Sequence, residues 1–309
     1  MPHRTPDVVL ADRFTKTLHT DATPALDPAN NKITASLAVC IIGASRGIGA
    51  GIAHAYASAG VSTLILCARP SSSQELSSVE QRCKELNPSI QTLCVGVDIT
   101  SSESVAQLAQ RIKEQVGKLD IVALNSGYSG PVVLKVTEGN PQDFQDVFEV
   151  NVQGTYLLAH HLIPLLVESK GARTFIAVGS FASCITSGHI ANTAYCISKL
   201  AQERLIEFIN EQFGKEEDGG VMAVAVHPGA VKTEMADRTT PDSFRKYLTD
   251  DAGLCGAFCV WLSQERRMWL NGRLLSATWD VDELLEKRGK IEEQDLLKFG
   301  LRVGDASAA

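Results

Sequence analysis

The chain has 309 residues and a formal net charge of −7, and its 44% apolar and 21% charged content is that of a globular protein able to bury a sizeable core. An acidic chain without a long basic run argues against binding to nucleic acid, which depends on clustered lysines and arginines. No window approaches the roughly 18 apolar residues of a membrane span, and residues 1–14 lack the apolar stretch of a signal peptide. We therefore expect a cytoplasmic protein.

The predicted elements begin after a proline- and aspartate-rich arm, residues 1–33, which we expect to be irregular. From about residue 37, short apolar runs rich in β-branched residues alternate with longer helical patterns. The six runs predict strands, in chain order "SLAVCIIG", "STLILCA", "QTLCVGV", "LDIVALN", "RTFIAVGS" and "GVMAVAVHP". Helical patterns stand between them at 47–60, 73–87, 102–117, 143–169 and 193–214.

This alternation predicts the fold. Near-continuous apolar strands separated by helices indicate a parallel sheet covered on both faces. Right-handed crossovers then give a doubly wound, three-layer α/β fold of the Rossmann type. A later helix at about 249–264 and a seventh strand, "GRLLSA", complete the sheet. We expect one central domain at 34–279, followed by a charged, surface-lying and partly helical tail at 280–309.

A glycine-rich turn joins the first predicted strand to the first helix. In "CIIGASRGIGAGIA", Gly43, Gly47 and Gly49 form a G-x-x-x-G-x-G pattern. These glycines permit a tight turn and a close approach of the backbone to a pyrophosphate, which meets the free N–H groups of the helix N-terminus. A bare strand-to-helix turn is the alternative, but the strand before and the helix after favour nucleotide binding.

The end of the second strand, "LCARP", bears on which nucleotide binds. NAD-binding sheets usually place an acidic side chain here against the ribose 2′-hydroxyl. This chain has Ala68 and Arg69 instead, and Arg46 lies in the glycine-rich loop. Two guanidiniums without a carboxylate favour a 2′-phosphate and hence NADP(H), the alternative being two solvated arginines. Asp98, after the third strand, is placed either to accept from an adenine amino group or to cap the next helix.

A tyrosine and a lysine lie four positions apart in "TAYCISKLA", residues 193–201. At this spacing Tyr195 and Lys199 share a helix face, which is most often an ordinary amphipathic face. A free tyrosine has a pKa of about 10, and a cation one turn away would lower it toward the range useful for proton transfer. Ser180 ends the fifth strand, where its hydroxyl could bond a substrate oxygen that gains charge; Ser183 is the alternative.

Together these motifs resemble the short-chain dehydrogenase/reductase family in its compact single-domain branch. "GASRGIG", "VNVQG", "AVGS", "YCISK" and "HPGAVKTEM" stand in the order and spacing of that family, and the resemblance covers about residues 37–277. The two ends of the chain resemble a fungal subgroup of these reductases, several of which serve secondary metabolism.

The resemblance implies that NADPH delivers hydride to a carbonyl carbon while Tyr195 protonates the oxygen and Lys199 holds the nicotinamide ribose. Asn151, with a local distortion of its helix, would hold a water that links Lys199 to solvent. The implied catalytic residues are Asn151, Ser180, Tyr195 and Lys199. The implied cofactor-binding residues are Gly43, Ser45, Arg46, Gly47, Ile48, Arg69, Asp98, Ile99, Asn125, Gly127, Tyr195, Lys199, Pro228, Gly229, Val231 and Thr233.

Two positions depart from the family. Ile42 stands where threonine usually precedes the first glycine, and Leu124 replaces the first asparagine of an Asn-Asn-Ala-Gly run of which Asn125 and Gly127 remain. The first and fourth strands should be neighbours in a doubly wound sheet. We therefore interpret the two changes as a paired polar-to-apolar exchange that leaves nucleotide binding intact.

The substrate should meet the carboxyl ends of the strands, between segments 128–136, 181–192 and 234–248. The side chains that make this region apolar are Tyr128, Phe181, Ile185, Met235 and Phe244, with His189 as a candidate polar contact. An apolar ketone or aldehyde, such as a polyketide-like intermediate, fits. A non-redox dehydratase, isomerase or cyclase and an inactive nucleotide-binding regulatory protein are the alternatives.

Two further expectations concern the assembly and the cysteines. By resemblance, the helices at 140–168 and 195–213 form the interface of a homodimer or homotetramer. The eight cysteines contain no CxxC pair and no zinc-like cluster, so we expect reduced thiols and no metal site.

Overall fold

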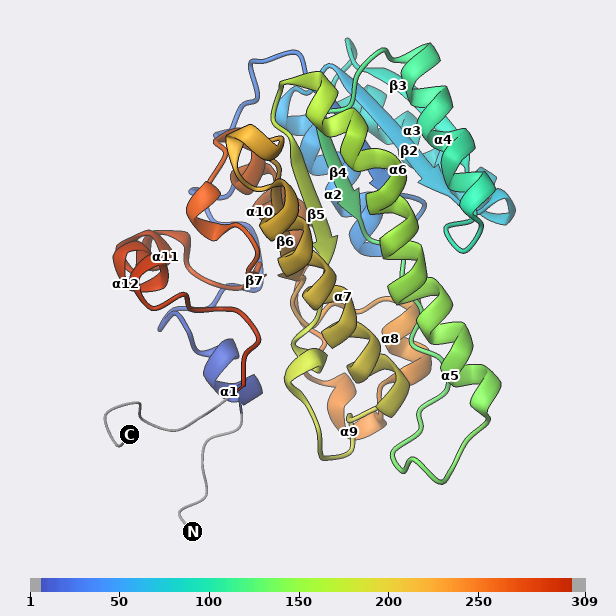
Figure 1. Cartoon of the computed structure of the whole chain (residues 1–309), viewed down its shortest axis with the longest axis vertical. Coiled ribbons are helices and arrows are strands. Elements are labelled where there is room, and N and C mark those ends of the chain that lie inside the picture. Colours follow the sequence, from blue (N-terminus) through green and yellow to red (C-terminus); the bar gives the residue numbers. More distant parts are fainter. Residues whose placement is uncertain (1–6, 302–309) are drawn as a thin grey trace.

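The computed structural model describes residues 7–301 of the chain. Its centre is a seven-stranded, all-parallel sheet in the order β3-β2-β1-β4-β5-β6-β7 (Figure 1). The strands are β1 (Ala38–Ile42), β2 (Thr63–Ala68), β3 (Gln91–Gly96), β4 (Ile121–Leu124), β5 (Thr174–Val178), β6 (Met222–His227) and β7 (Leu274–Ser276). β1, β4 and β5 are buried at every position, which explains why their sequences are continuous apolar runs. The predicted doubly wound α/β fold is confirmed.

Helices cover both faces of the sheet. On one face α2 (Gly47–Ala59) packs against α3 (Ser73–Leu86) and α10 (Ala252–Gln264). The other face is covered by α4 (Ser102–Gln115), α6 (Gly154–Ser169) and α7 (Thr193–Phe213), which contact one another in that order (Figure 1). A Cβ at Gly51 would lie 2.3 Å from the carbonyl oxygen of Ala252, so α2 and α10 approach more closely than ordinary side chains allow.

The remaining elements are short. The long helix predicted at 143–169 is divided into α5 (Pro141–Phe148), a π-helical turn (Glu149–Gln153) and α6. After β6 come α8 (Glu234–Thr239) and α9 (Asp242–Arg245), and the ends of the chain carry α1 (Asp7–Asp12), α11 (Val281–Glu286) and α12 (Arg288–Glu293).

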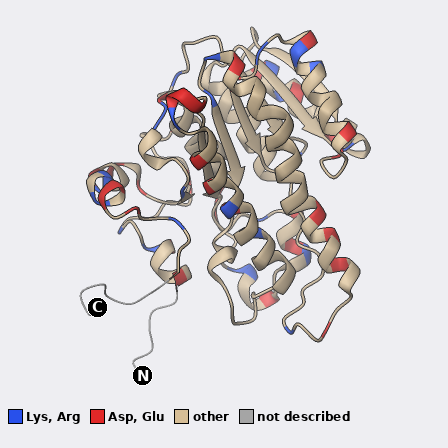
Figure 2. Cartoon of the chain, viewed as in Figure 1, with Lys and Arg blue, Asp and Glu red and all other residues tan. Residues whose placement is uncertain are grey.

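The strands of the sheet carry no charged side chain. Figure 2 shows lysine, arginine, aspartate and glutamate dispersed over helices and loops, while the strands carry none of them. Among the described residues, no helix is both long and apolar enough to cross a membrane. All eight cysteines are free thiols, and no cluster of side chains suited to a metal ion occurs in the described part of the chain.

The arm and the tail of the chain are joined to each other beside β7. The backbone of His19 donates to the carbonyl of Thr278 (2.7 Å), and the indole of Trp279 donates to the carbonyl of Ala11 (3.1 Å). The tail was expected to lie on the surface through its charges, but Val281, Leu284 and Ile291 are buried against the main body. It therefore belongs partly to the core, because an apolar stripe runs through its charged sequence.

Candidate active site

The carboxyl ends of the parallel strands meet at one edge of the sheet, and the predicted site residues gather there. Tyr195 and Lys199 project from successive turns of α7, as their spacing requires. Lys199 is buried, and its ammonium group donates to the carbonyl of Val178 and to the side-chain oxygen of Gln202, both at 2.8 Å. Its nitrogen lies 5.8 Å from the centroid of the Tyr195 ring, which is half-buried.

Asn151 lies in the π-helical turn and is fully buried. Its side-chain oxygen accepts from the backbone of Tyr128 (2.8 Å), and its amide donates to the carbonyl of Tyr128 (2.7 Å) and to the hydroxyl of Ser198 (2.9 Å). A Cβ at Gly127 would lie 3.3 Å from Asn151 Oδ1 and 3.8 Å from Lys199 Nζ. The helix distortion that the family resemblance implied is present, and Asn151, Gly127 and Lys199 meet at this point.

The structure distinguishes the two candidate serines. The Ser180 hydroxyl forms a hydrogen bond with Tyr195 that acts to lower the pKa of the phenol. The Ser183 hydroxyl instead donates to the backbone carbonyl of Ser180 at 2.7 Å. Ser180 is therefore the serine beside Tyr195, while Ser183 holds the turn Phe181–Cys184 that follows it.

The pKa of Tyr195 shifts in the direction opposite to the one expected from a cation one helical turn away. Burial raises the pKa of Tyr195 to about 12, against the hydrogen bond from Ser180. Burial also lowers the pKa of Lys199 to about 8. Loss of water is the largest cause of both shifts, and the ammonium group of Lys199 is bonded to Val178 and Gln202 rather than to the phenol.

Glu203 belongs to the same cluster, although we did not predict it. It follows Lys199 by one turn of α7, is only 3% exposed, and accepts from the backbone N–H of Ser180 through Oε1 at 3.2 Å. Burial raises the pKa of this carboxyl group to about 8. The signal available in the sequence was its position four residues after Lys199, on the face that already held Tyr195.

The glycine-rich loop has the tight geometry that a phosphate site requires. Gly43 has a φ of +86°, and a Cβ on it would lie 2.6 Å from the Ser126 hydroxyl. A Cβ at Gly49 would lie 1.9 Å from the carbonyl oxygen of Gly43, to which the amide of Asn125 donates at 3.0 Å. Arg46 precedes α2 in an extended conformation without a side-chain cap, so the first N–H groups of the helix remain available to an anion.

The side chains expected near the adenosine end lie on the surface. Arg69 is exposed, and its guanidinium makes no hydrogen bond or ion pair with any residue that the structure describes. Arg46 pairs with Glu234 at 3.0 Å, and both are about half exposed. Asp98 is exposed and accepts from the backbone and hydroxyl of Thr100. It does not cap α4, whose N-cap is Ser101.

The loop after β6 lies against the glycine-rich loop. Its residues Pro228 and Val231 are buried, and Gly229 has a φ of +94°. Thr233 caps α8 through its hydroxyl, which accepts from the backbone of Ala236, and its methyl group lies 3.5 Å from where a Cβ at Gly47 would be. Of the other sequence candidates, Ser45 and Ile48 are half-buried in the glycine-rich loop, and Ile99 is buried against Gly154.

Aromatic side chains in and around the predicted substrate segments contact one another. Phe181 stacks on His227 with ring centroids 4.4 Å apart, and burial lowers the pKa of that imidazole to about 4. The ring of His189 lies 6.4 Å from that of Phe244, so the segments 181–192 and 234–248 meet. Trp279, which we did not assign to the site, lies 6.0 Å from Phe181 and joins it to the ends of the chain.

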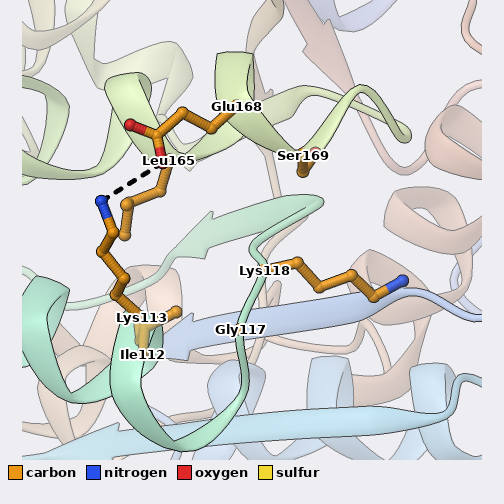
Figure 3. Close-up of a pocket in the computed structure, with 7 residues that line it drawn as sticks. All are labelled: Ile112, Lys113, Gly117, Lys118, Leu165, Glu168 and Ser169. Carbon is orange, nitrogen blue, oxygen red and sulfur yellow. Dashed lines mark ion pairs between the residues drawn. The ribbon is translucent and has the colours of Figure 1, made fainter.

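A separate surface cavity of about 150 Å³ lies between α4 and α6 (Figure 3). Its wall includes Gly117 and Lys118, which precede β4, and Ser169, which precedes β5, so it lies at the amino ends of the strands. Two of the residues that line it, Lys113 and Glu168, form an ion pair at 3.6 Å, drawn as a dashed line in Figure 3. The cavity is therefore remote from Tyr195.

Comparison with known proteins gives concordant matches. Residues 37–243 match the family model of short chain dehydrogenases. A short chain dehydrogenase of Aspergillus terreus, pgmD, is 34% identical over 94% of this chain and 94% of its own length. The short chain dehydrogenase mpl6 of Monascus purpureus is 37% identical over 92% and 94%. A short chain dehydrogenase from Shigella flexneri, solved in complex with NADP, superposes with a TM-score of 0.70 at 27% identity and covers 80% of this chain and 99% of its own.

Proposed function

Because this chain belongs to the short-chain dehydrogenase family, we propose that it is an NADP(H)-dependent oxidoreductase that reduces a ketone or aldehyde, or oxidises the corresponding alcohol, with Tyr195 as the general acid and base. The observation that carries this proposal is the convergence of Asn151, Ser180, Tyr195 and Lys199 beside the glycine-rich loop.

The residues of the loop fit a nicotinamide dinucleotide. A side chain at Gly43 or Gly49 would collide with the surrounding loop, so glycine is required at both positions. The N-terminus of α2 has free N–H groups that can bind a pyrophosphate. Lys199 would hold the nicotinamide ribose, and the segment from Pro228 to Thr233 would contact the nicotinamide end. Bound NADPH supplies the hydride.

The protein's own contribution to the reaction is proton transfer and charge stabilisation. Tyr195 would protonate the substrate oxygen, and the Ser180 hydroxyl, bonded to the same phenol, would donate to that oxygen as negative charge develops on it. Asn151 links the loop after β4 to α7 through its hydrogen bonds with Tyr128 and Ser198. It would thereby fix the position of Lys199 and Tyr195 relative to that loop.

Removal of the Ser180 hydroxyl tests which serine acts. We expect Ser180→Ala to lower kcat by roughly 10²–10³-fold, the usual cost of losing one such donor. Ser183→Ala removes a neutral hydrogen bond of about 1 kcal/mol and should lower kcat only a few-fold. Steady-state kinetics of both variants gives the comparison, and a larger loss in Ser183→Ala would reverse the assignment.

Arg69 carries the proposed preference for NADP(H), because its guanidinium has no partner among the described residues and would be free to pair with a 2′-phosphate. We expect Arg69→Asp to weaken NADPH binding by roughly 10- to 100-fold, since a hydrogen bond to a charged group contributes about 1.5–3 kcal/mol. NADH binding should not weaken. Arg82→Asp, the same change on the outer face of α3, is the control. Fluorescence titration with both cofactors measures the ratio, and equal losses in the two variants would contradict the assignment.

The proposed substrate is an apolar small molecule, such as an intermediate of secondary metabolism. Support comes from the apolar side chains of Phe181 and Phe244 in the segments after β5 and β6, and from the resemblance of the chain ends to a fungal subgroup. A panel of carbonyl compounds followed through NADPH absorbance tests this. Stoichiometric loss of NADPH supports reduction, whereas product without such loss would support a dehydratase, isomerase or cyclase.

We further propose a homodimer or homotetramer formed through α5, α6 and α7. Large apolar side chains are exposed on these helices, namely Phe144, Tyr156, Ile197, Leu200 and Phe208. An unpartnered apolar surface of this kind is typical of an interface between subunits.

A further inference from the structure

Glu203 is a buried acidic residue that the proposed reaction does not use. Its side chain is 3% exposed and contacts the backbone of Ser180. Oε1 accepts from the backbone N–H of Ser180 at 3.2 Å, while Oε2 is buried without a hydrogen-bond partner. A Cβ at Gly179 would lie only 3.0 Å from Oε1. Because Gly179 has no side chain, the carboxyl group of Glu203 can approach the backbone next to Ser180.

The backbone of Ser180 is held on both sides by this arrangement. Glu203 accepts from its N–H, and the Ser183 hydroxyl, which lies beside the Glu203 carboxyl group, donates to its carbonyl at 2.7 Å. Both of these contacts of Glu203 act to lower its pKa. What opposes a carboxylate here is burial, because Oε2 would carry charge with no hydrogen-bond partner.

The charges around Glu203 act in opposite directions: Lys199 lowers the pKa of the carboxyl group and Glu207 raises it. On α7 it faces Lys199, Tyr195 and Glu207, and from the turn after β5 it faces Cys184. The ammonium group of Lys199 is bonded to Val178 and Gln202 and forms no ion pair with Glu203. A buried carboxylate without an ion-pair partner is costly, and burial accordingly raises the pKa of this group to about 8.

We propose that Glu203 is a positioning residue that, as the neutral acid, fixes Ser180 against Tyr195. It acts through the backbone of Ser180 and the turn that follows, and does not touch the substrate. The proposal rests on the proposed function for its effect on turnover, but the protonation state it assigns can be measured without any substrate.

The kinetic test compares three variants. Glu203→Gln keeps the shape and an N–H donor, so kcat at pH 7 should stay close to that of the wild type. Glu203→Leu removes both hydrogen-bonding atoms, and kcat should fall roughly 10- to 100-fold with KM little changed, as a small misplacement of catalytic groups can cost. Glu211→Gln, an exposed position on the same helix, is the control and should match the wild type. Wild-type kcat in Glu203→Leu, or equal losses in Glu203→Gln and Glu203→Leu, would overturn the proposal.

The second test uses stability against pH and needs no turnover. The pKa of Glu203 is raised from 4.5 to about 8 in the folded protein, so the native state must hold a proton that the unfolded chain has released in this interval. Stability from this group is therefore lost as the pH rises from about 5 to about 8 and is constant above that. Glu203→Gln escapes the loss, and its melting temperature relative to the wild type should be higher at pH 8 than at pH 5. Glu211→Gln should give no such trend.

A melting-temperature difference between Glu203→Gln and the wild type that is equal at pH 5 and pH 8 would overturn the assigned neutral state. If no carbonyl compound is turned over but the trend with pH is observed, the proposed function fails while the state of Glu203 stands. The two failures are therefore distinguishable.

Discussion

Replacement of Tyr195 by phenylalanine is expected to lower kcat by roughly 10²–10⁴-fold, the range that a positioned acid or base contributes. The change removes one oxygen and leaves the ring in place, so the hydrogen bond with Ser180 and the proton for the substrate are lost together. NADPH affinity should remain nearly unchanged, because the glycine-rich loop is not altered. Turnover by NADPH absorbance and binding by fluorescence measure the two effects separately.

Tyr156→Phe is the comparison for this variant: Tyr156 lies on α6 in the proposed subunit interface, outside the catalytic cluster, and loss of its hydroxyl should leave kcat close to that of the wild type. If Tyr195→Phe retained most of the activity, the proposed mechanism would be wrong.

The pKa of Tyr195 also predicts how each direction of the reaction depends on pH. With a pKa of about 12, Tyr195 is protonated throughout the neutral range in the free protein. Reduction therefore has its proton available, while oxidation, which needs the tyrosinate, should accelerate as the pH rises.

The second large effect is expected from Gly49→Ala. The added Cβ would lie 1.9 Å from the carbonyl oxygen of Gly43 and 2.7 Å from the side-chain nitrogen of Asn125. The carbonyl belongs to the backbone, so the loop itself must shift, and a forced shift of this kind costs about 1–3 kcal/mol. If that cost falls on cofactor binding, NADPH affinity should drop by roughly 10- to 100-fold, and the melting temperature should fall as well.

Gly289→Ala provides the control for the glycine experiment. Gly289 lies in α12, has no neighbour within 4 Å of a built Cβ, and should bind NADPH like the wild type. Wild-type affinity in Gly49→Ala would show that the loop is not the cradle for the cofactor.

The two departures from the family pattern lie next to each other in the sheet, as the predicted strand order implied. Ile42 and Leu124 are register partners on the adjacent parallel strands β1 and β4, and both are buried. The expected adjacency of these strands is confirmed, and partners in register project their side chains on the same face of the sheet. Asn125 retains its contact with Gly43 beside them, so the loop geometry is kept with an apolar pair beneath it.

The sequence alone determined the sheet, its helical layers and the spacing of Tyr195 and Lys199, because strand burial and helical periodicity are local properties that residue patterns record directly. It could not decide between Ser180 and Ser183, since both serines stand near the end of β5 and only the path of the following turn directs one hydroxyl to Tyr195.

Only the tertiary structure shows how deeply each ionisable side chain is buried, because local sequence patterns do not record this. The face of α7 that holds Glu203 is covered by the end of β5, and the resulting loss of water raises the pKa of Tyr195 and Glu203 while lowering that of Lys199. Desolvation depends on atoms contributed by segments far apart in the chain, so the direction of the pKa shift at Tyr195 became visible only once those segments were packed together.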